Sequence, residues 1–404
     1  MPEKNIHKKY KVNNDFYAEE DFIKDCPNSQ FVPTVLPPVH RLIAIGDIHG
    51  DLNLAIKSFK LAKLIDDDYN WIGADTVVVQ VGDQIDSCRP IPGVYDCHHH
   101  RYPGDKPDDM RVIDFFNNMH RKALAAGGAV YSLLGNHELM NSQGKFNYVS
   151  YDNFYNFKYE TTDKNNYEGP SGRRDLFKPG GKVANMLACN RLSVLVVGST
   201  MFVHAGILPV LASRLDHLNI DSDTKLRYLN AVVRKWLLNN LSKQDENNKT
   251  MFINDIELSP FWTRVYGNIP ENVNINSTEC FSSVKKTIEV FKLGQLVVGH
   301  TPQMFTNKSG INGTCYEKYD NTNKLYRVDG GFSQAFKVFG DNDLVQVLEI
   351  IDDKEFNILT DKTIHEYIKP PNININDREM QKISYIYSQN RPNTDKKINK
   401  HKFY

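Results

Sequence analysis

The sequence predicts an α/β fold, because short apolar runs alternate along the chain with longer amphipathic segments. Short runs rich in β-branched residues are typical of buried strands. These runs are Leu42–Ile45, Val77–Val81, Val130–Leu134, Val194–Val197, Met201–Val203 and Leu296–Val298. Two segments, Asp108–Ala126 and Thr224–Leu241, carry apolar residues on one helical face and are predicted to be surface helices. Polar clusters follow directly after five of the strands, where open α/β sheets present their functional loops.

The 404 residues are expected to form one catalytic domain with a tail at each end. Residues 1–40 are polar, end in a proline-containing run, and are predicted to be an irregular lead-in. The catalytic domain is expected from residue 41 to residue 363, with loops or insertions at Asn141–Pro170 and Gly267–Ser277. Residues 364–404 are rich in asparagine and lysine, which is typical of a polar, basic and loosely ordered tail.

Charge and cysteine usage limit the classes of protein to consider. The 49 basic residues cancel the 49 acidic ones, so no global charge draws the chain to nucleic acid or to a membrane. Residues 1–14 lack the apolar run of a secretory signal, and no later segment reads as a membrane span. The six cysteines lack metal-knuckle spacing and are interpreted as reduced thiols of an intracellular, cytoplasmic enzyme. Only the pairing of Cys88 with Cys97, which flank one polar loop, is left open.

Five polar clusters, each with a small residue beside a metal-type ligand, stand at the ends of five predicted strands. They are Gly46-Asp47-Ile48-His49-Gly50, Gly82-Asp83-Gln84-Ile85-Asp86, Gly135-Asn136-His137-Glu138, Val203-His204-Ala205-Gly206 and Gly299-His300-Thr301. Singly, each is more often a turn or the edge of a core than a functional site. Together they indicate a site, because unpaired aspartate and histidine at strand ends carry a desolvation cost that metal coordination relieves.

The ligand types in these clusters are carboxylate, imidazole and amide, without sulfur. Such a mixed nitrogen and oxygen set suits Mn, Fe or Zn. Two divalent ions about 3.5 to 4 Å apart need a shared carboxylate, which a set with two aspartates can supply. The sequence therefore predicts a site for two divalent metal ions. The candidate ligands are Asp47, His49, Asp83, Asn136, His204 and His300.

In order and residue type, the clusters resemble the signature of the calcineurin-like metallophosphoesterase superfamily, and within it the phosphoprotein phosphatases. Four motifs resemble the Shewanella-like protein phosphatase branch more narrowly. They are Leu133-Leu134-Gly135-Asn136-His137-Glu138-Leu139-Met140-Asn141, Phe177-Lys178-Pro179-Gly180-Gly181, Phe261-Trp262-Thr263-Arg264 and Val328-Asp329-Gly330-Gly331-Phe332-Ser333. The resemblance extends from about Arg41 to Ile350. It implies a fold in which two mixed β-sheets pack as a sandwich flanked by helices.

The resemblance also implies a role for each site residue, with Asp83 bridging the two ions. The ligands it implies are, for the first ion, Asp47, His49 and Asp83 and, for the second, Asp83, Asn136, His204 and His300. His137 would be the general acid that protonates the leaving group, oriented and kept protonated by Asp86. Arg264 would grip the phosphoryl oxygens. The implied mechanism is direct attack by a metal-activated hydroxide, without a phosphoenzyme.

One position departs from the family's pattern. Phosphoprotein phosphatases normally carry a phosphate-binding arginine where this chain has Ser87. Arg89, two residues further along, is the first candidate to replace it, because a guanidinium offers two parallel donors where a serine hydroxyl offers one. Arg173 and Arg174 are the alternatives, and a solvated loop is the competing interpretation of that pair.

Three functions stay open from the sequence. The leading hypothesis is a protein phosphatase acting on phosphotyrosine or on phosphoserine and phosphothreonine. The second is a hydrolase of dinucleoside polyphosphates or other small phosphoesters, whose signature overlaps strongly. The third is a catalytically weak module that binds phosphopeptides, suggested only by Ser87. The predicted partners are phosphorylated substrates, with no nucleic acid and no membrane.

Overall fold

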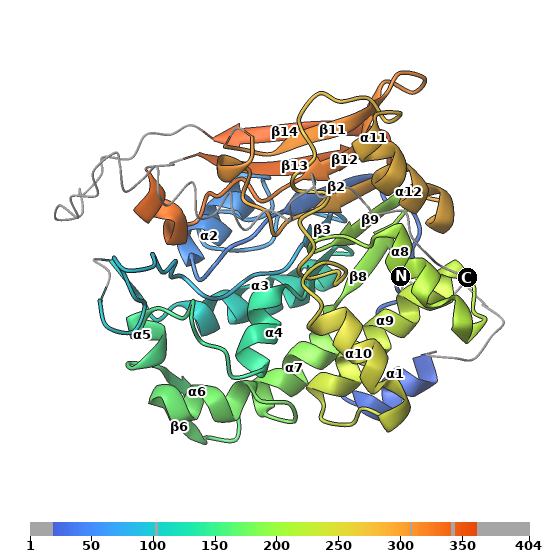
Figure 1. The fold of residues 1–404 in the computed structure, drawn as a ribbon. Coiled ribbons are helices and arrows are strands. Elements are labelled where there is room, and N and C mark those ends of the chain that lie inside the picture. The colour runs from blue at the N-terminus through green and yellow to red at the C-terminus, as the bar shows by residue number, and fades with distance from the viewer. Residues whose placement is uncertain (1–18, 102–103, 308, 341–343, 362–404) are drawn as a thin grey trace.

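Two mixed β-sheets pack face to face in the computed structural model, which describes residues 19–101, 104–307, 309–340 and 344–361 (Figure 1). The first sheet has the strand order β1 (Val35–Leu36), β8 (Val194–Val197), β9 (Thr200–Val203), β10 (Gln295–Val298), β12 (Thr322–Arg327) and β11 (Asn312–Glu317). The second has the order β14 (Glu355–Asp361), β13 (Val345–Ile351), β2 (Arg41–Ile45), β3 (Val77–Gln80), β4 (Ala129–Leu133) and β7 (Arg191–Leu192). Strands β5 (Lys158–Glu160) and β6 (Asn166–Glu168) form a separate hairpin.

Parallel strands occupy the centre of each sheet. In the second sheet β2, β3 and β4 run parallel, with Leu42 opposite Val77 and Val77 opposite Ala129. In the first sheet β9, β10 and β12 run parallel, with Leu296 opposite both Met201 and Leu325. The loops that leave the carboxyl ends of these strands therefore lie along one edge of each sheet.

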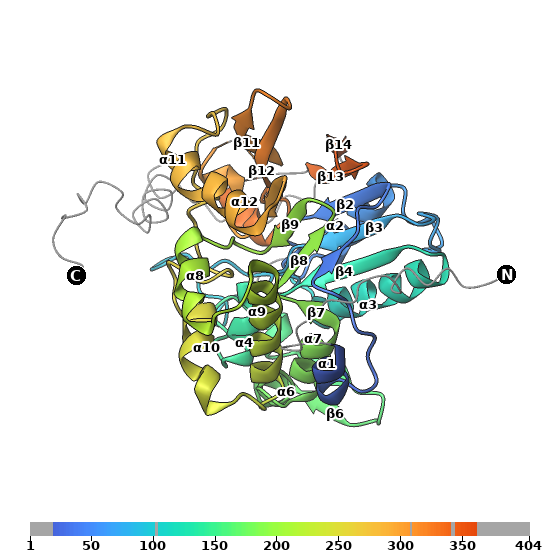
Figure 2. The same ribbon diagram turned by 90° about the vertical axis from the view of Figure 1, so that its right-hand side faces the viewer.

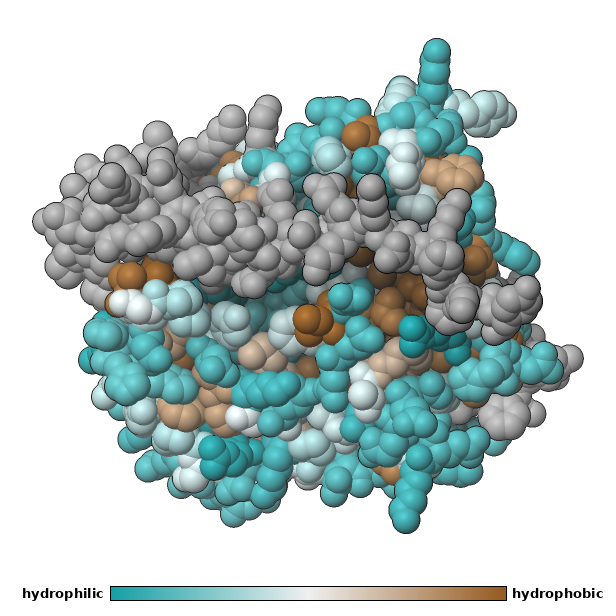
Figure 3. All heavy atoms as spheres, viewed as in Figure 1, coloured by the Kyte–Doolittle hydropathy of each residue, from teal (hydrophilic) through white to brown (hydrophobic). Residues whose placement is uncertain are grey.

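Helices flank the sandwich on both sides. They are α1 (Glu19–Asp25), α2 (Leu52–Leu61), α3 (Asp109–Ala125), α4 (Asn136–Ser142), α5 (Tyr151–Phe154), α6 (Gly169–Phe177), α7 (Lys182–Asn190), α8 (Pro209–Arg214), α9 (Ser222–Leu237), α10 (Glu246–Ile253), α11 (Thr278–Cys280) and α12 (Lys286–Phe291). Helix α2 begins where the Asp51 carboxylate accepts a hydrogen bond from the Leu54 N–H, and Asp221 caps α9 in the same way. In Figure 2 helices α9 and α3 lie on either side of α7. Outside the atoms drawn in grey, most of the face seen in Figure 3 is hydrophilic, and apolar groups show mainly along its middle.

Alternating side chains of the strands divide between separate cores. Leu42 and Ala44 of β2 point into the core between the sheets, which they share with Phe202 of β9. Ile43 and Ile45 point the other way, into a core that α2 and α3 close. On the far side of the first sheet, α7 and α9 contribute to a third core. The predicted sandwich of two mixed sheets flanked by helices is thus confirmed.

The predicted elements appear in the structure, and additional ones are found. The predicted strands coincide with β2, β3, β4, β8, β9 and β10, and the predicted helices with α3 and α9. The segment Asn141–Pro170, predicted as a loop, contains α5 and the β5–β6 hairpin, which are too short to show a periodicity. The predicted lead-in contains α1 and β1, whereas the predicted tail, residues 364–404, lies outside the described residues. No helix of the described residues combines the length and apolar character needed to cross a bilayer.

The six cysteines are paired in disulfides, which corrects one prediction. The pairs are Cys26–Cys189, Cys88–Cys97 and Cys280–Cys315. The prediction of reduced thiols is wrong, and the basis for expecting a cytoplasmic enzyme is lost with it. Cys26 and Cys189 are separated by 163 residues, so only the fold, which brings the end of α1 to α7, could reveal their contact. The pairing of Cys88 with Cys97, left open by the sequence, is present.

Candidate metal centre

The five polar clusters meet at the carboxyl ends of β2, β3, β4, β9 and β10. Two glycines allow this close approach. A Cβ at Gly82, where φ is +101°, would lie 2.6 Å from the backbone nitrogen of Gly135. A Cβ at Gly299 would lie 2.3 Å from the carboxylate of Asp47. A larger residue at either position would therefore push two of the clusters apart.

Asp83 lies at the centre of the site. Its Oδ2 is 3.3 Å from His204 Nε2 and 3.8 Å from His49 Nε2, and that His49 nitrogen is also 3.8 Å from Asp47 Oδ2. Two groups of ligand-type atoms, each within 4.8 Å, share the Asp83 carboxylate: His49, Asp83 and His137, and Asp83, His204 and His300. The first group thus includes His137, which the sequence assigned to proton transfer, with Asp47 beside it.

Asn136 joins the second group through its amide oxygen. This Oδ1 lies 2.9 Å from His204 Nε2 and 2.9 Å from His300 Nδ1. The other nitrogen of each ring faces a backbone carbonyl, that of Val81 at 2.9 Å for His204 and that of Trp262 at 3.0 Å for His300. Holding one ring nitrogen fixes the ring and leaves the other directed into the site. The structure therefore brings all six predicted ligands together.

The charge of the site fits a bound cation. Asp47, Asp83 and Asp329 are buried, and Oδ2 of Asp329 has no hydrogen-bond donor among the described residues. Burial, together with the nearby Asp329 and Asp83 carboxylates, raises the pKa of Asp47 well above its ordinary value. Buried carboxylates this close repel one another unless a positive charge lies among them. These side chains therefore suit a divalent ion.

Two of the imidazoles, those of His49 and His300, and the central carboxylate have the protonation states that metal ligands need. Burial and the nearby Arg89 lower the pKa of His49 well below its ordinary value, and burial has the same effect on the pKa of His300. A neutral ring keeps the lone pair that coordinates a metal. Burial alone would raise the pKa of Asp83, but neighbouring imidazoles, His204 above all, hold that pKa well below its ordinary value. Asp83 is therefore an anion at neutral pH.

His137 stands beside these ligands, supported by a hydrogen-bond network. Its Nδ1 lies 2.8 Å from Asp86 Oδ2, and its backbone N–H donates to Asp83 Oδ1 at 2.9 Å. The Asp86 carboxylate also accepts hydrogen bonds from Asn141, at 2.9 and 3.1 Å, and from Arg173 at 3.3 Å. Asp86 therefore orients the His137 ring and is itself held from behind.

Arg173 belongs to this supporting network and lies outside the metal cavity. Its side chain is fully buried and donates to Asp109 at 2.7 Å and to Asn141 at 2.8 Å. Burial raises the pKa of Asp109 to about 6, although Arg173 opposes that shift. The placement matches neither a phosphate clamp nor a solvated loop. Arg174 is exposed, near the Phe146 ring, and does not line the cavity either.

Arg89 and Arg264 line the cavity over the metal-type ligands. This cavity has a volume of about 80 Å³. Arg89 is buried, donates to the carbonyls of Asp86 and Cys88 at 3.0 and 2.7 Å, and lies 4.6 Å from the centre of the Phe336 ring. Arg264 donates to the His300 carbonyl at 3.2 Å. Of the candidates to replace the arginine missing at position 87, Arg89 is therefore the one that the fold places at the cavity.

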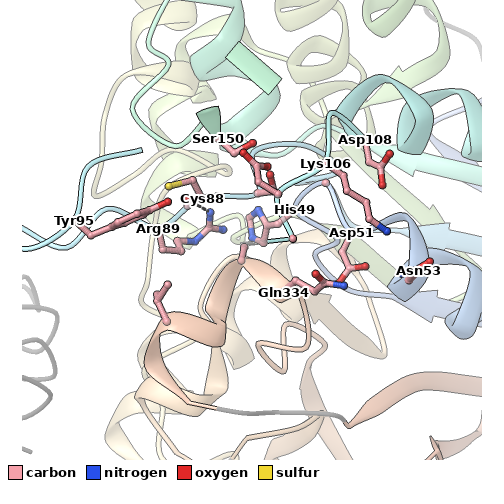
Figure 4. Close-up of a pocket in the computed structure, with 16 residues that line it drawn as sticks. His49, Asp51, Asn53, Cys88, Arg89, Tyr95, Lys106, Asp108, Ser150 and Gln334 are labelled. Carbon is pink, nitrogen blue, oxygen red and sulfur yellow. Dashed lines mark hydrogen bonds between the residues drawn. The ribbon is translucent and has the colours of Figure 1, made fainter. Parts of the chain in front are cut away.

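A smaller pocket of about 40 Å³ adjoins this cavity. Figure 4 shows Arg89 and His49 side by side within it, between Tyr95 and Lys106. Because Arg89 and His49 line both pockets, the two hollows are neighbouring parts of one site. Tyr95, which stands in the segment 91–107 that had no role in the sequence interpretation, thus contributes to the rim.

Glu138 joins two of the ligand-bearing loops. Its carboxylate accepts the backbone N–H groups of Asp83 at 3.0 Å, Gln84 at 2.8 Å and Gly135 at 2.7 Å. The loop after β3 is thereby tied to the loop after β4. The sequence placed Glu138 within a cluster but gave it no role. Every residue except proline has a backbone N–H, so the residue types of the partners do not reveal a hydrogen bond to that group.

Four site residues adopt a left-handed backbone, which residues other than glycine rarely take. The φ angles are +48° at His49, +53° at Asp83, +72° at Asp86 and +67° at His300. This conformation costs roughly 1–2 kcal/mol per residue. It persists only where surrounding contacts hold it, and it is concentrated at functional sites.

Comparisons with known proteins agree with this geometry. The family model for calcineurin-like phosphoesterases matches residues 40–304, which is more than half of the chain. An uncharacterized protein of Acanthamoeba polyphaga mimivirus is 63% identical over 249 residues, covering 61% of this chain and 98% of that protein. Shewanella-like protein phosphatase 2 of Arabidopsis thaliana is 28% identical over 386 residues, covering 87% of this chain and 86% of that protein.

Solved structures show the same fold. A cold-active protein tyrosine phosphatase superposes with a TM-score of 0.55 at 20% identity, over 85% of this chain and 83% of that one. The cold-active protein-tyrosine phosphatase of a psychrophilic Shewanella species gives a TM-score of 0.54 at 19% identity, over 85% of each chain. The resemblance first indicated by the motifs is thereby confirmed. The chain belongs to the calcineurin-like phosphoesterase family and is a metal-dependent hydrolase of phosphate esters.

Proposed function

We propose that the chain is a protein phosphatase whose site holds two divalent ions bridged by Asp83. The observation that carries this proposal is that one carboxylate belongs to both groups of ligand-type atoms. Asp47 and His49 would complete the coordination of one ion, and Asn136, His204 and His300 would complete that of the other. The mixed nitrogen and oxygen set favours Mn, Fe or Zn.

Two such ions would activate a water for attack on phosphorus and would offset the charge on the phosphoryl oxygens. The residues of the chain supply the remaining steps. His137, which lines the cavity, is proposed to protonate the leaving oxygen, with Asp86 orienting its ring. Arg89 and Arg264 are proposed to donate charge-assisted hydrogen bonds to the phosphoryl group.

Phosphotyrosine is the proposed substrate, on the evidence of the cavity wall. Tyr148, Trp262, Phe305 and Phe336 line the cavity, so a phenyl ester would meet aromatic side chains next to the metal ligands. The Arabidopsis relative is named a protein phosphatase, which supports a phosphoprotein substrate over a dinucleoside polyphosphate. Convergence of all six predicted ligands opposes the weak binding module.

Parallel turnover of three substrates tests this proposal. With Mn²⁺ added, a phosphotyrosine peptide, the matched phosphoserine peptide and a dinucleoside tetraphosphate are compared by phosphate release and by product chromatography. Aromatic contacts of about 0.5–1.5 kcal/mol should favour phosphotyrosine over phosphoserine by roughly two- to tenfold in kcat/KM. Faster turnover of the dinucleotide than of either peptide would replace the proposal with the small-molecule alternative.

Substitution Asp83→Asn tests the proposed bridge. Asparagine keeps an oxygen that can accept the His137 N–H, so the fold should be retained, but it removes the anion that both ions would share. We expect bound metal, counted by elemental analysis, to fall for both ions together. The exposed Asp68→Asn variant is the matched control. Retention of two ions per chain with a near-normal rate would show that another residue is the bridge.

A series of arginine variants tests the phosphate clamp. Loss of a charge-assisted clamp costs about 1.5–3 kcal/mol, so Arg89→Ala and Arg264→Ala should each lower kcat/KM by roughly ten- to a hundredfold. Both should also weaken inhibition by vanadate. Arg174→Ala, exposed and outside the cavity, is the control and should match the parent chain. If Arg89→Ala retained full efficiency and vanadate affinity, Arg89 would not be the replacement for the missing arginine.

Arg173→Ala separates support from substrate binding. Because Arg173 is buried between Asp86 and Asp109, its loss leaves two carboxylates without their cation and should destabilise the fold by roughly 3–5 kcal/mol. Two quantities are measured for the variant: its melting temperature, and its affinity for vanadate at a temperature where it is folded. A variant that keeps its melting temperature but loses vanadate affinity would assign Arg173 to phosphate after all.

A further inference from the structure

A cavity of about 540 Å³ lies apart from the metal centre. Its walls come mainly from residues 22–34, α3, β4, α7, β7 and α9, and none of its lining residues lines the metal cavity. Figure 2 shows α1 close to α7 and α9. The α1 wall is fixed to the body by the Cys26–Cys189 disulfide and by Arg234, which donates to Asp21 and Asp25 at 3.0 Å. The cavity is therefore held open by anchored walls.

One part of the wall is apolar and aromatic. Phe22 and Phe31 lie with ring centres 5.5 Å apart, and Phe116, Tyr131 and Leu192 also line the cavity. Pockets of this volume, lined mainly by apolar and aromatic groups with a few polar ones, typically hold an organic molecule of drug size.

The charged side chains of the wall are of one sign. Arg121, Arg191, Arg227 and Arg234 line the cavity, and no aspartate or glutamate is among the described lining residues. Arg234 is paired with aspartates of α1, but within the described part of the chain no ion pair joins any of the other three to a carboxylate. A ligand in this cavity would therefore meet a positive potential.

Arg191 is the most informative of these arginines because it is buried. Its Nη1 donates to Asn117 at 2.7 Å and its Nη2 to Gln84 at 3.0 Å, both neutral groups, while its Nε–H has no acceptor in the described residues. Burial lowers the pKa of Arg191 to about 10. The Glu138 and Asp114 carboxylates act on Arg191 only from beyond ion-pair distance, so an oxyanion in the cavity would supply the direct charged partner that the described residues do not give it.

His120 adds a neutral donor to the same wall. Its Nδ1 accepts the Val130 N–H at 3.3 Å, which leaves Nε2 to carry the ring proton. Burial and the nearby Arg191 lower the pKa of His120 to about 4, so the ring is uncharged at neutral pH.

We propose that this cavity binds an organic anion, with its oxyanion head toward Arg191 and its apolar body against the aromatic wall. Carboxylate, phosphate and sulfonate heads share the required chemistry. The proposal concerns a second site and does not depend on the function proposed for the metal centre.

The first experiment compares two dyes that differ in charge. Anilinonaphthalene sulfonate is an apolar anion, and phenylnaphthylamine is the same body without the sulfonate. Both are titrated by fluorescence into the full chain. We expect the sulfonate to bind at least about tenfold more tightly, as a charge-assisted contact requires. Equal affinities would overturn the proposal, because the cavity would then select bulk and not charge.

Variants then locate the binding. Leu124 lines the cavity and is 37% exposed, so it can be changed without disturbing the core. Leu124→Glu and Leu124→Gln differ only in charge; the first should weaken binding of the sulfonate dye by roughly three- to tenfold, and the second by less than twofold. Equal affinities of these two variants would place the dye elsewhere and overturn the assignment.

Arg191→Gln is the sharper variant if it folds, as judged by its melting curve. It should weaken binding of the sulfonate dye by roughly ten- to a hundredfold, while the exposed Arg214→Gln should change nothing. Displacement of the dye by decanoate or by naphthylphosphonate then tells which head the site prefers. Failure of both competitors would overturn the proposal of an organic-anion site.

Discussion

Exhaustive chelation is expected to stop hydrolysis of phosphate esters by this chain, lowering the rate by at least about a thousandfold. Among the described residues, the lining of the metal cavity includes no serine, threonine or cysteine that could attack phosphorus. The proposed mechanism uses water as the nucleophile, and the buried Asp47, Asp83 and Asp329 suit the cations that would activate it. Phosphate release and metal content are measured on the same sample.

Metal add-back is the control for this result. Mn²⁺, Fe²⁺ and Zn²⁺ are returned separately, and the rate should recover in proportion to the metal bound. Melting curves before and after chelation separate loss of catalysis from loss of fold. Full turnover by protein shown to be metal-free would end the proposed mechanism.

Substitution His137→Asn is expected to slow esters with poor leaving groups by roughly a hundred- to ten-thousandfold. The leaving group of an alkyl phosphate is a strongly basic alkoxide, which needs a proton as it leaves. The leaving group of an activated aryl phosphate is a weakly basic phenoxide, which leaves largely without one. The variant should therefore lose far less on an activated aryl ester. The measurement is kcat for a series of esters whose leaving groups differ in pKa.

Two further variants qualify the role of His137. Asp86→Asn leaves the imidazole in place but removes the carboxylate 2.8 Å from its Nδ1, so it should show a smaller version of the same leaving-group dependence. The exposed His217→Asn should behave as the parent chain. Equal losses by His137→Asn on every ester would make the imidazole a metal ligand or positioning group, in keeping with its place in the first ligand group.

The candidate metal ligands could be placed from the sequence because each stands within a few residues of a strand. A run such as Val77–Val81 indicates a buried strand. The residues that follow a parallel strand lie at the carboxyl edge of the sheet, so their position follows from the position of the strand. Asp83 and His204 could thus be placed at one edge of the fold without knowledge of any contact. The sandwich itself was predicted from the motifs as a resemblance, not from periodicity.

The supporting residues could not be predicted, because their role depends on contacts between distant segments. Asp109 begins α3 and has the pattern of an ordinary acidic residue in a first helical turn. Only the fold shows that it is buried against Arg173. Asp329 stood in a quoted motif, but nothing in the sequence revealed that it approaches Asp47. The same reason explains the wrong prediction for the cysteines, since spacing carries no information about which segments meet.

The left-handed backbone at His49, Asp83, Asp86 and His300 affects which substitutions the chain can accept once selection for catalysis is lost. Glycine takes this conformation freely, so glycine at any of these positions would relieve strain while removing a side chain that the site uses. A gene copy released from selection for catalysis could accept glycine at His49, Asp83 or His300, whereas at Asp86 the lost carboxylate would leave buried Arg173 without that acceptor. Among descendants of this chain, glycine at these three positions would therefore be an early mark of a pseudoenzyme, visible before the strands themselves diverge.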